Sequence, residues 1–329
     1  MEWAAWGHYV SPMPPSVVSP LAHPTWRARL VHWLVSLRMR PHARRPINPR
    51  WVRLNMGRPR GARQLMARST GTTFERRAPA GLWPGGEVVS WPARTEQAPV
   101  VLYLHGGGYI ACSPETHRSL VGSIVRRIRG LAYVPQYRLA PEHPFPAALD
   151  DALAAYRYLR EHEQVDPRRL VIAGDSAGGG LALALVMAIR DEGHPLPAAI
   201  VTFCPWTDLA ATGASLVEND LRCAMFAGDT IRRAASFYVG AASPEHPLLS
   251  PLYGDFHGLP PLLIHACTDE VLRDDAIRVV DRARCAGVSV EFRLWRSVPH
   301  VWQFFAAVLP EARASLADAT RFMIHHTTR

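Results

Sequence analysis

A short apolar run that leads into a serine between two glycines constrains the fold of this chain most strongly. Residues 169–173 have the length and composition of a buried strand, and residues 174–178 read G-D-S-A-G. Residues 181–190, rich in Leu and Ala, have the composition of a helix. A strand, a glycine-flanked serine and a helix form a nucleophile elbow, whose tight turn presents a serine hydroxyl to a base. The pattern predicts Ser176 as a nucleophile, although the pentapeptide alone is common by chance.

The rest of the chain alternates between strand-like and helix-like segments. Predicted strands lie at residues 100–104, 131–137, 199–203, 262–266 and 288–295, and predicted helices at 118–129, 147–162, 274–286 and 311–325. This alternation predicts an α/β fold with a mostly parallel sheet covered on both faces. Residues 74–77 and 87–91 are expected to add antiparallel strands. Residues 207–248 interrupt the alternation and are expected to lie over the carboxyl edge of the sheet, where ligands bind in such folds.

A second glycine-rich turn, H-G-G-G at residues 105–108, directly follows the predicted strand 100–104. Acyl transfer builds negative charge on a carbonyl oxygen, and backbone N–H groups aimed at that oxygen lower the barrier. Glycines allow such a close approach, so Gly106, Gly107 and Gly108 are expected to form half of an oxyanion hole. The N–H of Ala177 is expected to complete it. His105 is interpreted as a brace for the loop.

A serine nucleophile needs a base and an acid. Along a chain with a nucleophile elbow, the acid follows the serine and the histidine base comes last. Asp269 comes just after the predicted strand 262–266 and is the first choice for the acid. Glu270, Asp274 and Asp275 compete with it, although acids also gather at a helix N-terminus for electrostatic reasons. His300 follows the last predicted strand and is the predicted base.

Several longer motifs accompany these residues, in a fixed order from residue 99 to the C-terminus. They are H-G-G-G at 105–108, Y-R-L-A-P-E-H-P-F-P-A-A at 137–148, G-D-S-A-G-G at 174–179, P-W-T-D-L at 205–209, S-P-L-Y at 250–253, G-L-P-P at 258–261, T-D-E-V-L-R-D-D at 268–275 and P-H-V-W at 299–302. In these motifs the chain resembles the hormone-sensitive-lipase-like family of α/β-hydrolase carboxylesterases. The first 75 residues carry no matching motif.

The resemblance implies the α/β-hydrolase fold, with about eight mostly parallel strands and a helical cap. The cap would comprise the N-terminal arm, residues 1–75, and the insertion 207–248, and the catalytic domain would be residues 76–329. The resemblance also implies a Ser176–His300–Asp269 triad. The implied oxyanion donors are Gly107, Gly108 and Ala177, and the supporting residues are His105, Gly106, Asp175 and Glu142. No metal or cofactor is expected.

The expected activity is hydrolysis of short- to medium-chain acyl esters through an acyl-serine, with a small-molecule ester as the partner. An amidase or deacetylase would use the same triad, and only the pocket would differ. A non-catalytic ligand receptor on the same fold is a third hypothesis. It is disfavoured because such a receptor would be expected to lack a triad member.

The charge of the chain is concentrated in its N-terminal arm. The formal net charge is +9, and residues 3–74 contain 12 arginines and no acid. Residues 26–40 predict a helix with Trp and Leu on one face. That face is expected either to pack as part of the cap or to contact anionic lipid. Nucleic-acid binding is disfavoured because the arm has no recognisable module.

Two expectations concern the cellular setting of the chain. The N-terminus does not resemble a secretory signal, so a cytoplasmic protein is expected, with a peripheral membrane contact of the arm as the alternative. A homodimer stays open. The five cysteines lack a C-x-x-C pair and mostly lie in apolar context, which favours buried free thiols over disulfides or a metal site.

Overall fold

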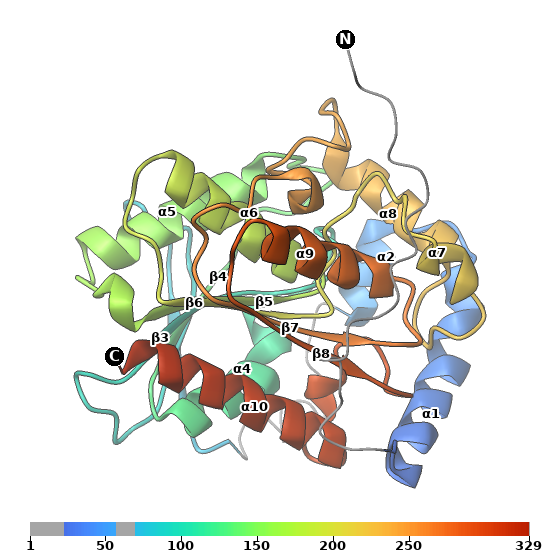
Figure 1. Ribbon diagram of the computed structural model, residues 1–329, viewed down its shortest axis with the longest axis horizontal. Coiled ribbons are helices and arrows are strands. Elements are labelled where there is room, and N and C mark those ends of the chain that lie inside the picture. The colour runs from blue at the N-terminus through green and yellow to red at the C-terminus, as the bar shows by residue number, and fades with distance from the viewer. Residues whose placement is uncertain (1–22, 57–69, 329) are drawn as a thin grey trace.

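A single eight-stranded sheet forms the centre of the molecule in the computed structural model, which describes residues 23–56 and 70–328 (Figure 1). Its strand order is β1-β2-β4-β3-β5-β6-β7-β8. Strand β2 pairs antiparallel with both of its neighbours, β1 and β4, and all the other neighbouring strands are parallel. The strands are β1 (Thr73–Arg77), β2 (Gly86–Ser90), β3 (Val100–Leu104), β4 (Leu131–Pro135), β5 (Leu170–Asp175), β6 (Ala199–Phe203), β7 (Leu262–Cys267) and β8 (Val290–Trp295). The sequence prediction of a mostly parallel sheet with an antiparallel beginning is therefore confirmed.

Helices cover both faces of the sheet and bury a core against each (Figure 1). One face carries α5 (Ala147–Glu161), α6 (Ala177–Asp191) and α9 (Arg273–Cys285), and the other carries α4 (Pro114–Ile128) and α10 (Pro310–Thr327). Strands β3, β5 and β6 are buried at every residue, because helices lie on both sides of them. This explains why their sequences are continuous apolar runs.

Among the described residues, four further helices lie outside these two layers. They are α1 (Trp26–Ala43), α2 (Pro49–Met56), α7 (Ser215–Glu218) and α8 (Gly228–Val239). Side chains of α1, α2 and α8 line the same cavity as Ser176, so these helices form one wall of that cavity. Residues 1–22 and 57–69 of the N-terminal arm lie outside the described residues. No helix within the described ranges is long and apolar enough to cross a membrane.

The predicted helix at residues 26–40 exists but continues through Pro41 to Ala43. Pro41 lies in the last turn, where the loss of its N–H removes only one helical hydrogen bond. Contacts with the insertion after β6 hold this end of the helix: the Arg40 guanidinium donates to the carbonyl oxygens of Asp220 and Cys223, each at 2.8 Å. The apolar face of this helix, expected either to pack as part of the cap or to contact lipid, is exposed over most of its length, with Trp26 at 69% and Trp33 at 55%.

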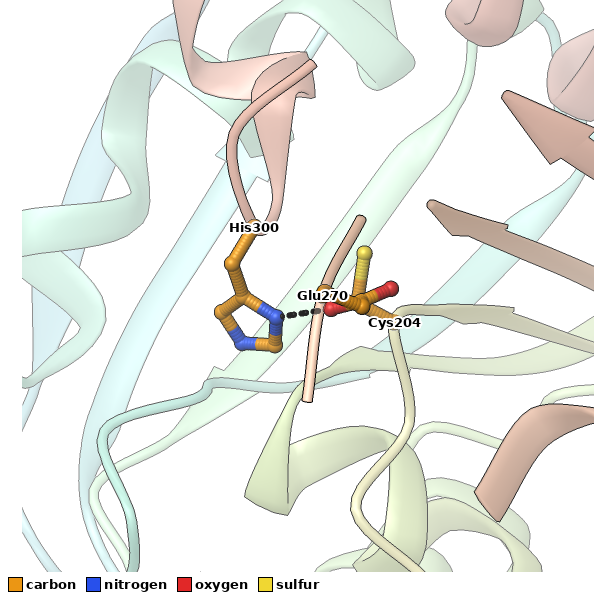
Figure 2. Close-up of side chains that lie close together, drawn as sticks. All are labelled: Cys204, Glu270 and His300. Carbon is orange, nitrogen blue, oxygen red and sulfur yellow. Dashed lines mark hydrogen bonds and ion pairs between the residues drawn. The ribbon is translucent and has the colours of Figure 1, made fainter. Parts of the chain in front are cut away.

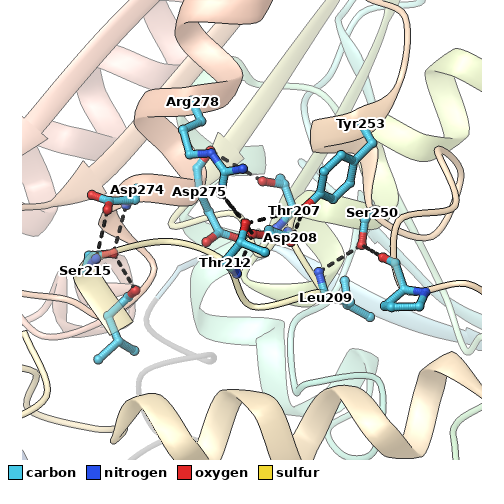
Figure 3. Close-up of polar contacts among 12 residues, drawn as sticks. Thr207, Asp208, Leu209, Thr212, Ser215, Ser250, Tyr253, Asp274, Asp275 and Arg278 are labelled. Atoms are coloured by element: carbon cyan, nitrogen blue, oxygen red, sulfur yellow. Dashed lines mark hydrogen bonds and ion pairs between the residues drawn. The ribbon is translucent and has the colours of Figure 1, made fainter. Parts of the chain in front are cut away.

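A buried polar network joins the start of α9 to the insertion that follows β6 (Figure 3). Asp275 Oδ2 accepts hydrogen bonds from the backbone N–H groups of Thr207 and Asp208 at 2.7 and 2.9 Å. The Asp208 carboxylate in turn accepts from Arg278 Nη1 at 2.9 Å and from the Tyr253 hydroxyl at 3.1 Å. Burial, followed by the nearby Asp208 carboxylate, raises the pKa of Asp275 to about 8. Asp275 therefore carries a proton at neutral pH and has a structural role.

This raised pKa makes stability fall as the pH rises. An aspartate in an unfolded chain ionises near 3.9, so between about pH 4 and pH 8 the folded state holds a proton that the unfolded state has lost. One proton corresponds to a slope of at most ~1.4 kcal/mol per pH unit. Asp275→Asn keeps an acceptor oxygen for both N–H groups but cannot ionise. Urea unfolding from pH 5 to pH 9 should show wild type losing stability relative to Asp275→Asn up to about pH 8. Parallel curves for the two proteins would show that Asp275 is already ionised.

Candidate active site

Ser176 occupies a strained turn between β5 and α6, as expected for an elbow. Its backbone has φ 53° and ψ −124°, a conformation that non-glycine residues rarely adopt. The Ser176 N–H donates to the carbonyl oxygen of Phe203 at 2.9 Å, which ties the turn to the end of β6. A side chain at Gly178 would place its Cβ 2.1 Å from the carbonyl oxygen of Leu104, so only glycine fits there. The last glycine of the G-x-S-x-G motif thus allows the elbow to lie close to β3.

The glycine loop after β3 faces the same space as the serine. Gly107 has φ 124°, which favours glycine, and Gly106, Gly107 and Gly108 line the cavity together with Ser176. Helix α6 begins at Ala177, so the first N–H groups of that helix lack acceptors within it. Backbone donors from two elements therefore lie near the nucleophile, an arrangement that can stabilise an oxyanion.

A buried carboxylate next to Ser176 supports the glycine loop. Asp175 Oδ1 accepts hydrogen bonds from the Tyr103 hydroxyl at 2.8 Å and from the Gly106 N–H at 3.1 Å. His117 Nε2, from α4, lies 3.2 Å from the same oxygen. Burial raises the pKa of Asp175, but His117 and Tyr103 outweigh that effect and hold the pKa below its usual value. The carboxylate thus stays charged and fixes the position of Gly106.

His105 lies beneath the loop, in agreement with a bracing role. Its ring is fully buried and stacks on Tyr137 with 4.2 Å between the ring centroids, and its Nδ1 lies 2.9 Å from the Gly106 carbonyl oxygen. Burial, followed by the nearby His117, lowers the pKa of His105 to about 3. The ring is therefore neutral at physiological pH, and it is absent from the residues that line the cavity.

The structure corrects the choice of carboxylate for His300. His300 Nδ1 lies 2.6 Å from Glu270 Oε2, and both side chains are almost completely buried (Figure 2). The other Glu270 oxygen accepts from the Cys267 N–H at 2.8 Å. The predicted acid, Asp269, instead accepts from the Ser297 N–H at 3.0 Å through Oδ2. The glutamate side chain reaches inward from the turn after β7, whereas its neighbour caps the turn after β8.

The remaining acidic competitors do not contact His300. Asp274 Oδ2 accepts from the Ser215 N–H at 2.8 Å, and Asp275 holds residues 207 and 208. Both lie in the first turn of α9, the position favoured by the helix dipole. They anchor the insertion to α9.

A cysteine completes a group that could in principle hold a metal ion. Ligand atoms of Cys204, Glu270 and His300 lie within 4.8 Å of one another (Figure 2). Metal binding requires a thiolate, but burial and the nearby Glu270 raise the pKa of Cys204 well above its usual value. Two of the three potential ligands, Glu270 and His300, are also hydrogen-bonded to each other. The donor set therefore fits a carboxylate–histidine pair better than a metal site.

Ser176 and His300 meet at one cavity of about 680 Å³. His300 Nε2 is buried and has no hydrogen-bond partner among the described residues, so it is available to a hydroxyl or a substrate. The cavity wall is largely apolar, and Phe226 contacts the His300 ring edge-on with 5.2 Å between centroids. A serine, a histidine and two sets of backbone donors around an apolar cavity are the components that acyl transfer needs.

The expected supporting residue Glu142 contacts the N-terminal arm. Glu142 pairs with Arg53 of α2, with 2.6 Å between Oε2 and Nη2. Sequence reasoning missed Arg53, because it is one of many arginines in a segment without motifs. It also missed Tyr103 and His117, which belong to an ordinary strand and helix pattern. Their contacts with Asp175 span 72 and 58 residues, and no local signal reports such pairing.

Comparisons with known proteins agree with this geometry. A family model described as an alpha/beta hydrolase fold matches residues 101–304. An acetyl-hydrolase of Streptomyces hygroscopicus is 44% identical over 73% of this chain and 83% of its own length. An esterase of Acinetobacter venetianus is 33% identical over 72% of this chain and 78% of its own.

Solved structures show the same similarity. The esterase EstE5, in a crystal soaked with p-nitrophenyl butyrate, superposes with a TM-score of 0.84 at 35% identity. That match covers 93% of this chain and 100% of EstE5. An esterase from the bacterial hormone-sensitive lipase family gives a TM-score of 0.80 at 35% identity, covering 93% of this chain and 99% of the other. This chain therefore belongs to the bacterial hormone-sensitive-lipase family of α/β-hydrolase esterases.

Proposed function

We propose that this chain is a serine carboxylesterase that hydrolyses short- to medium-chain acyl esters, with Ser176, His300 and Glu270 as its triad. The pairing of His300 Nδ1 with Glu270 at 2.6 Å carries the proposal, because it fixes which histidine nitrogen is free to act as a base. A carboxylate that accepts from Nδ1 keeps the proton on that nitrogen and leaves Nε2 as an acceptor. Family membership and the apolar cavity around Ser176 support an ester as the substrate.

The proposed reaction proceeds in two steps. Ser176 Oγ attacks the acyl carbon while His300 Nε2 takes the hydroxyl proton, and the N–H groups of Gly107, Gly108 and Ala177 stabilise the oxyanion. The intermediate collapses to an acyl-serine when His300 returns the proton to the leaving alcohol. Water, deprotonated by His300, then releases the acid and regenerates the serine. Glu270 stabilises the imidazolium that forms in each step.

We further propose that α1 rests on an anionic lipid surface. Five apolar side chains of α1 form a strip that we call the α1 face: Trp26, Leu30, Trp33, Leu34 and Leu37, which are 42–69% exposed. Residues 23–56 contain eight arginines and no acid, and Arg27 and Arg29 of α1 have no ion pair with a described residue. Apolar residues flanked by arginines suit the interface of an anionic membrane.

The position of the α1 face supports this proposal. Leu34 and Arg38 are exposed and also line the cavity that contains Ser176. Helix α1 lies beside α7, where Val217 is also exposed, at 73% (Figure 1). An ester that partitions into the lipid would therefore meet the cavity where α1 touches the surface.

The activity is tested with a chain-length series of p-nitrophenyl esters. Ser176→Ala should lower turnover on the order of 10⁴-fold or more, because the serine forms the covalent intermediate. Ser236→Ala, which removes a hydroxyl on α8 away from the cavity, is the control and should keep wild-type turnover. Turnover above a few per cent in Ser176→Ala would overturn the assignment. A matched anilide hydrolysed faster than its ester would make the chain an amidase.

The identity of the acid is tested with two neighbouring substitutions. In Glu270→Gln, the side-chain oxygen is expected to keep the hydrogen bond from the Cys267 N–H, so the amide NH₂ faces His300. That group cannot accept from Nδ1, so the histidine loses its working tautomer, and kcat should fall on the order of 10³–10⁴-fold. Asp269→Asn keeps an acceptor for Ser297 and should cost less than about tenfold. A larger loss in Asp269→Asn than in Glu270→Gln would restore the choice made from sequence.

Lipid contact is tested by co-sedimentation with phosphatidylglycerol and phosphatidylcholine vesicles at low and high salt. The full chain should bind the anionic vesicles, and less at high salt. Replacing Arg27 and Arg29 with Gln should weaken binding about tenfold or more, since each basic residue near the surface contributes ~1 kcal/mol.

Two further variants and one measurement complete the vesicle experiment. Replacing Trp33 and Leu37 with Gln should abolish binding, whereas Ile324→Gln on α10 is the control and should not change it. Binding that is absent, or equal on both lipids and insensitive to salt, would overturn the proposal. The oligomeric state is measured by analytical sedimentation. If wild type is a homodimer and the Trp33 and Leu37 variant is a monomer, the α1 face would bind a second copy of the chain instead of lipid.

A further inference from the structure

A single arginine of α2 joins the helical wall of the cavity to the loop that carries the oxyanion glycines. The Arg53 guanidinium donates from Nε to the Ile110 carbonyl oxygen and from Nη2 to the Ala140 carbonyl oxygen, each at 2.7 Å. It also forms a two-point ion pair with Glu142, at 2.9 and 2.6 Å. Arginine suits such a position, because its planar fork presents several donors in a fixed geometry.

The first of these acceptors belongs to the turn that shapes the oxyanion loop. The N–H groups of Ile110 and Ala111 both donate to the Gly107 carbonyl oxygen, at 3.2 and 3.1 Å. Gly107 has no room to relax on that side, since a Cβ there would lie 2.2 Å from the Ala111 carbonyl oxygen. The position of the Ile110 peptide therefore sets the position of the Gly107 peptide.

The second acceptor belongs to the neighbouring loop, which is tied to the first. The Ala140 N–H donates to the Tyr109 carbonyl oxygen at 2.9 Å, so Arg53 bridges two segments that are already in contact. Both carbonyl oxygens thus accept from one side chain of α2. Without the guanidinium, these two oxygens would lose a charged donor. The loss of a hydrogen bond from a charged donor raises the free energy more than the loss of a neutral one.

We propose that Arg53 is a positioning residue that holds the oxyanion loop in its working geometry only while α2 is docked. This inference rests on the proposed esterase function. Side chains of α2 line the cavity at Trp51 and Val52, so the helix that contacts a bound ester also carries the clamp on the oxyanion loop. The position of α2 at the cavity and the geometry of the oxyanion loop are thereby coupled through one side chain.

This role predicts a particular kinetic pattern. An oxyanion hole binds the transition state and not the ground state, so a displaced donor lowers kcat and leaves KM little changed. Loss of one whole oxyanion donor costs about 10²–10³-fold in kcat in a known case. Removing the clamp displaces the donors without deleting them, so Arg53→Ala should cost roughly tenfold.

The test compares Arg53→Ala, Arg53→Lys and Glu142→Gln, with kcat expressed per active site after titration with a fluorophosphonate. Glu142→Gln leaves both carbonyl contacts of Arg53 in place and should lose less than about threefold. Arg53→Lys, which can reach one carbonyl oxygen, should lie between the two. Arg157→Ala is the matched control, since it removes an exposed Arg–Glu pair of 2.5 Å with Glu192, away from the cavity.

A trifluoromethyl ketone separates positioning from folding. Ser176 Oγ adds to its carbonyl carbon, the hydroxyl proton passes to His300, and the carbonyl oxygen becomes an alkoxide in the oxyanion hole. Arg53→Ala should weaken this inhibitor by about the same factor as it lowers kcat, with KM changed less than threefold. A purely structural role would lower the melting temperature or the titrated fraction but leave kcat per active site unchanged.

The outcomes separate the two proposals. Ser176→Ala in the same assay must be inactive, which is the check on the esterase function itself. Given that result, Arg53→Ala with wild-type kcat per active site, or a loss confined to KM, would overturn the clamp. A loss in Glu142→Gln as large as that in Arg53→Ala would move the role from the carbonyl contacts to the ion pair.

Discussion

The strained backbone of Ser176 is the constraint on which the rest of the site depends. A residue at φ 53° and ψ −124° is stable only where its surroundings impose that conformation. Here β5 enters the turn from a fully buried position, α6 leaves it, and the serine N–H is tied to β6. The flanking glycines have no side chains, so β3 can lie close to the turn. This places the oxyanion loop beside the serine. The parallel sheet is thus the frame that imposes one unfavourable residue conformation.

The groups that surround the serine come from separate loops, and each is fixed by its own buried polar contacts. Asp175 holds Gly106, Glu270 holds His300, and Asp275 holds the start of the insertion after β6. Each of these carboxyl groups is nearly inaccessible to water, and each has hydrogen-bonding partners that compensate for its burial. Such buried, hydrogen-bonded carboxyl groups favour a single arrangement of the loops, which a reaction with several simultaneous contacts requires.

The sequence predicts the architecture well and the fine pairing less well. Periodicity locates the eight strands and the helices that cover the sheet, because continuous apolar runs and glycine-rich turns are local signals, but it gives no sign of α7 and α8 in the insertion. The choice between Asp269 and Glu270 depends on which way adjacent residues of one turn point, and a one-residue shift is invisible to spacing. The exposure of Trp26 and Trp33 could not be predicted either, because the sequence of an apolar helix face does not show which surface packs against it. Arg53 acts across 57 and 87 residues, beyond any sequence pattern considered.

The unequal accessibility of the five cysteines has a consequence for handling the protein. Cys204, Cys223 and Cys267 are buried, Cys112 is half-buried, and Cys285 is exposed at the end of α9. Exposed thiols are the ones that air oxidises and that join two chains. Helix α9 rises about 1.5 Å per residue, which puts Cys285 roughly 20 Å from Leu272 at the cavity. Stored protein should therefore accumulate dimers linked by a disulfide at Cys285, in which the cavity stays open. Measurements of the oligomeric state need a reductant, whereas activity assays do not.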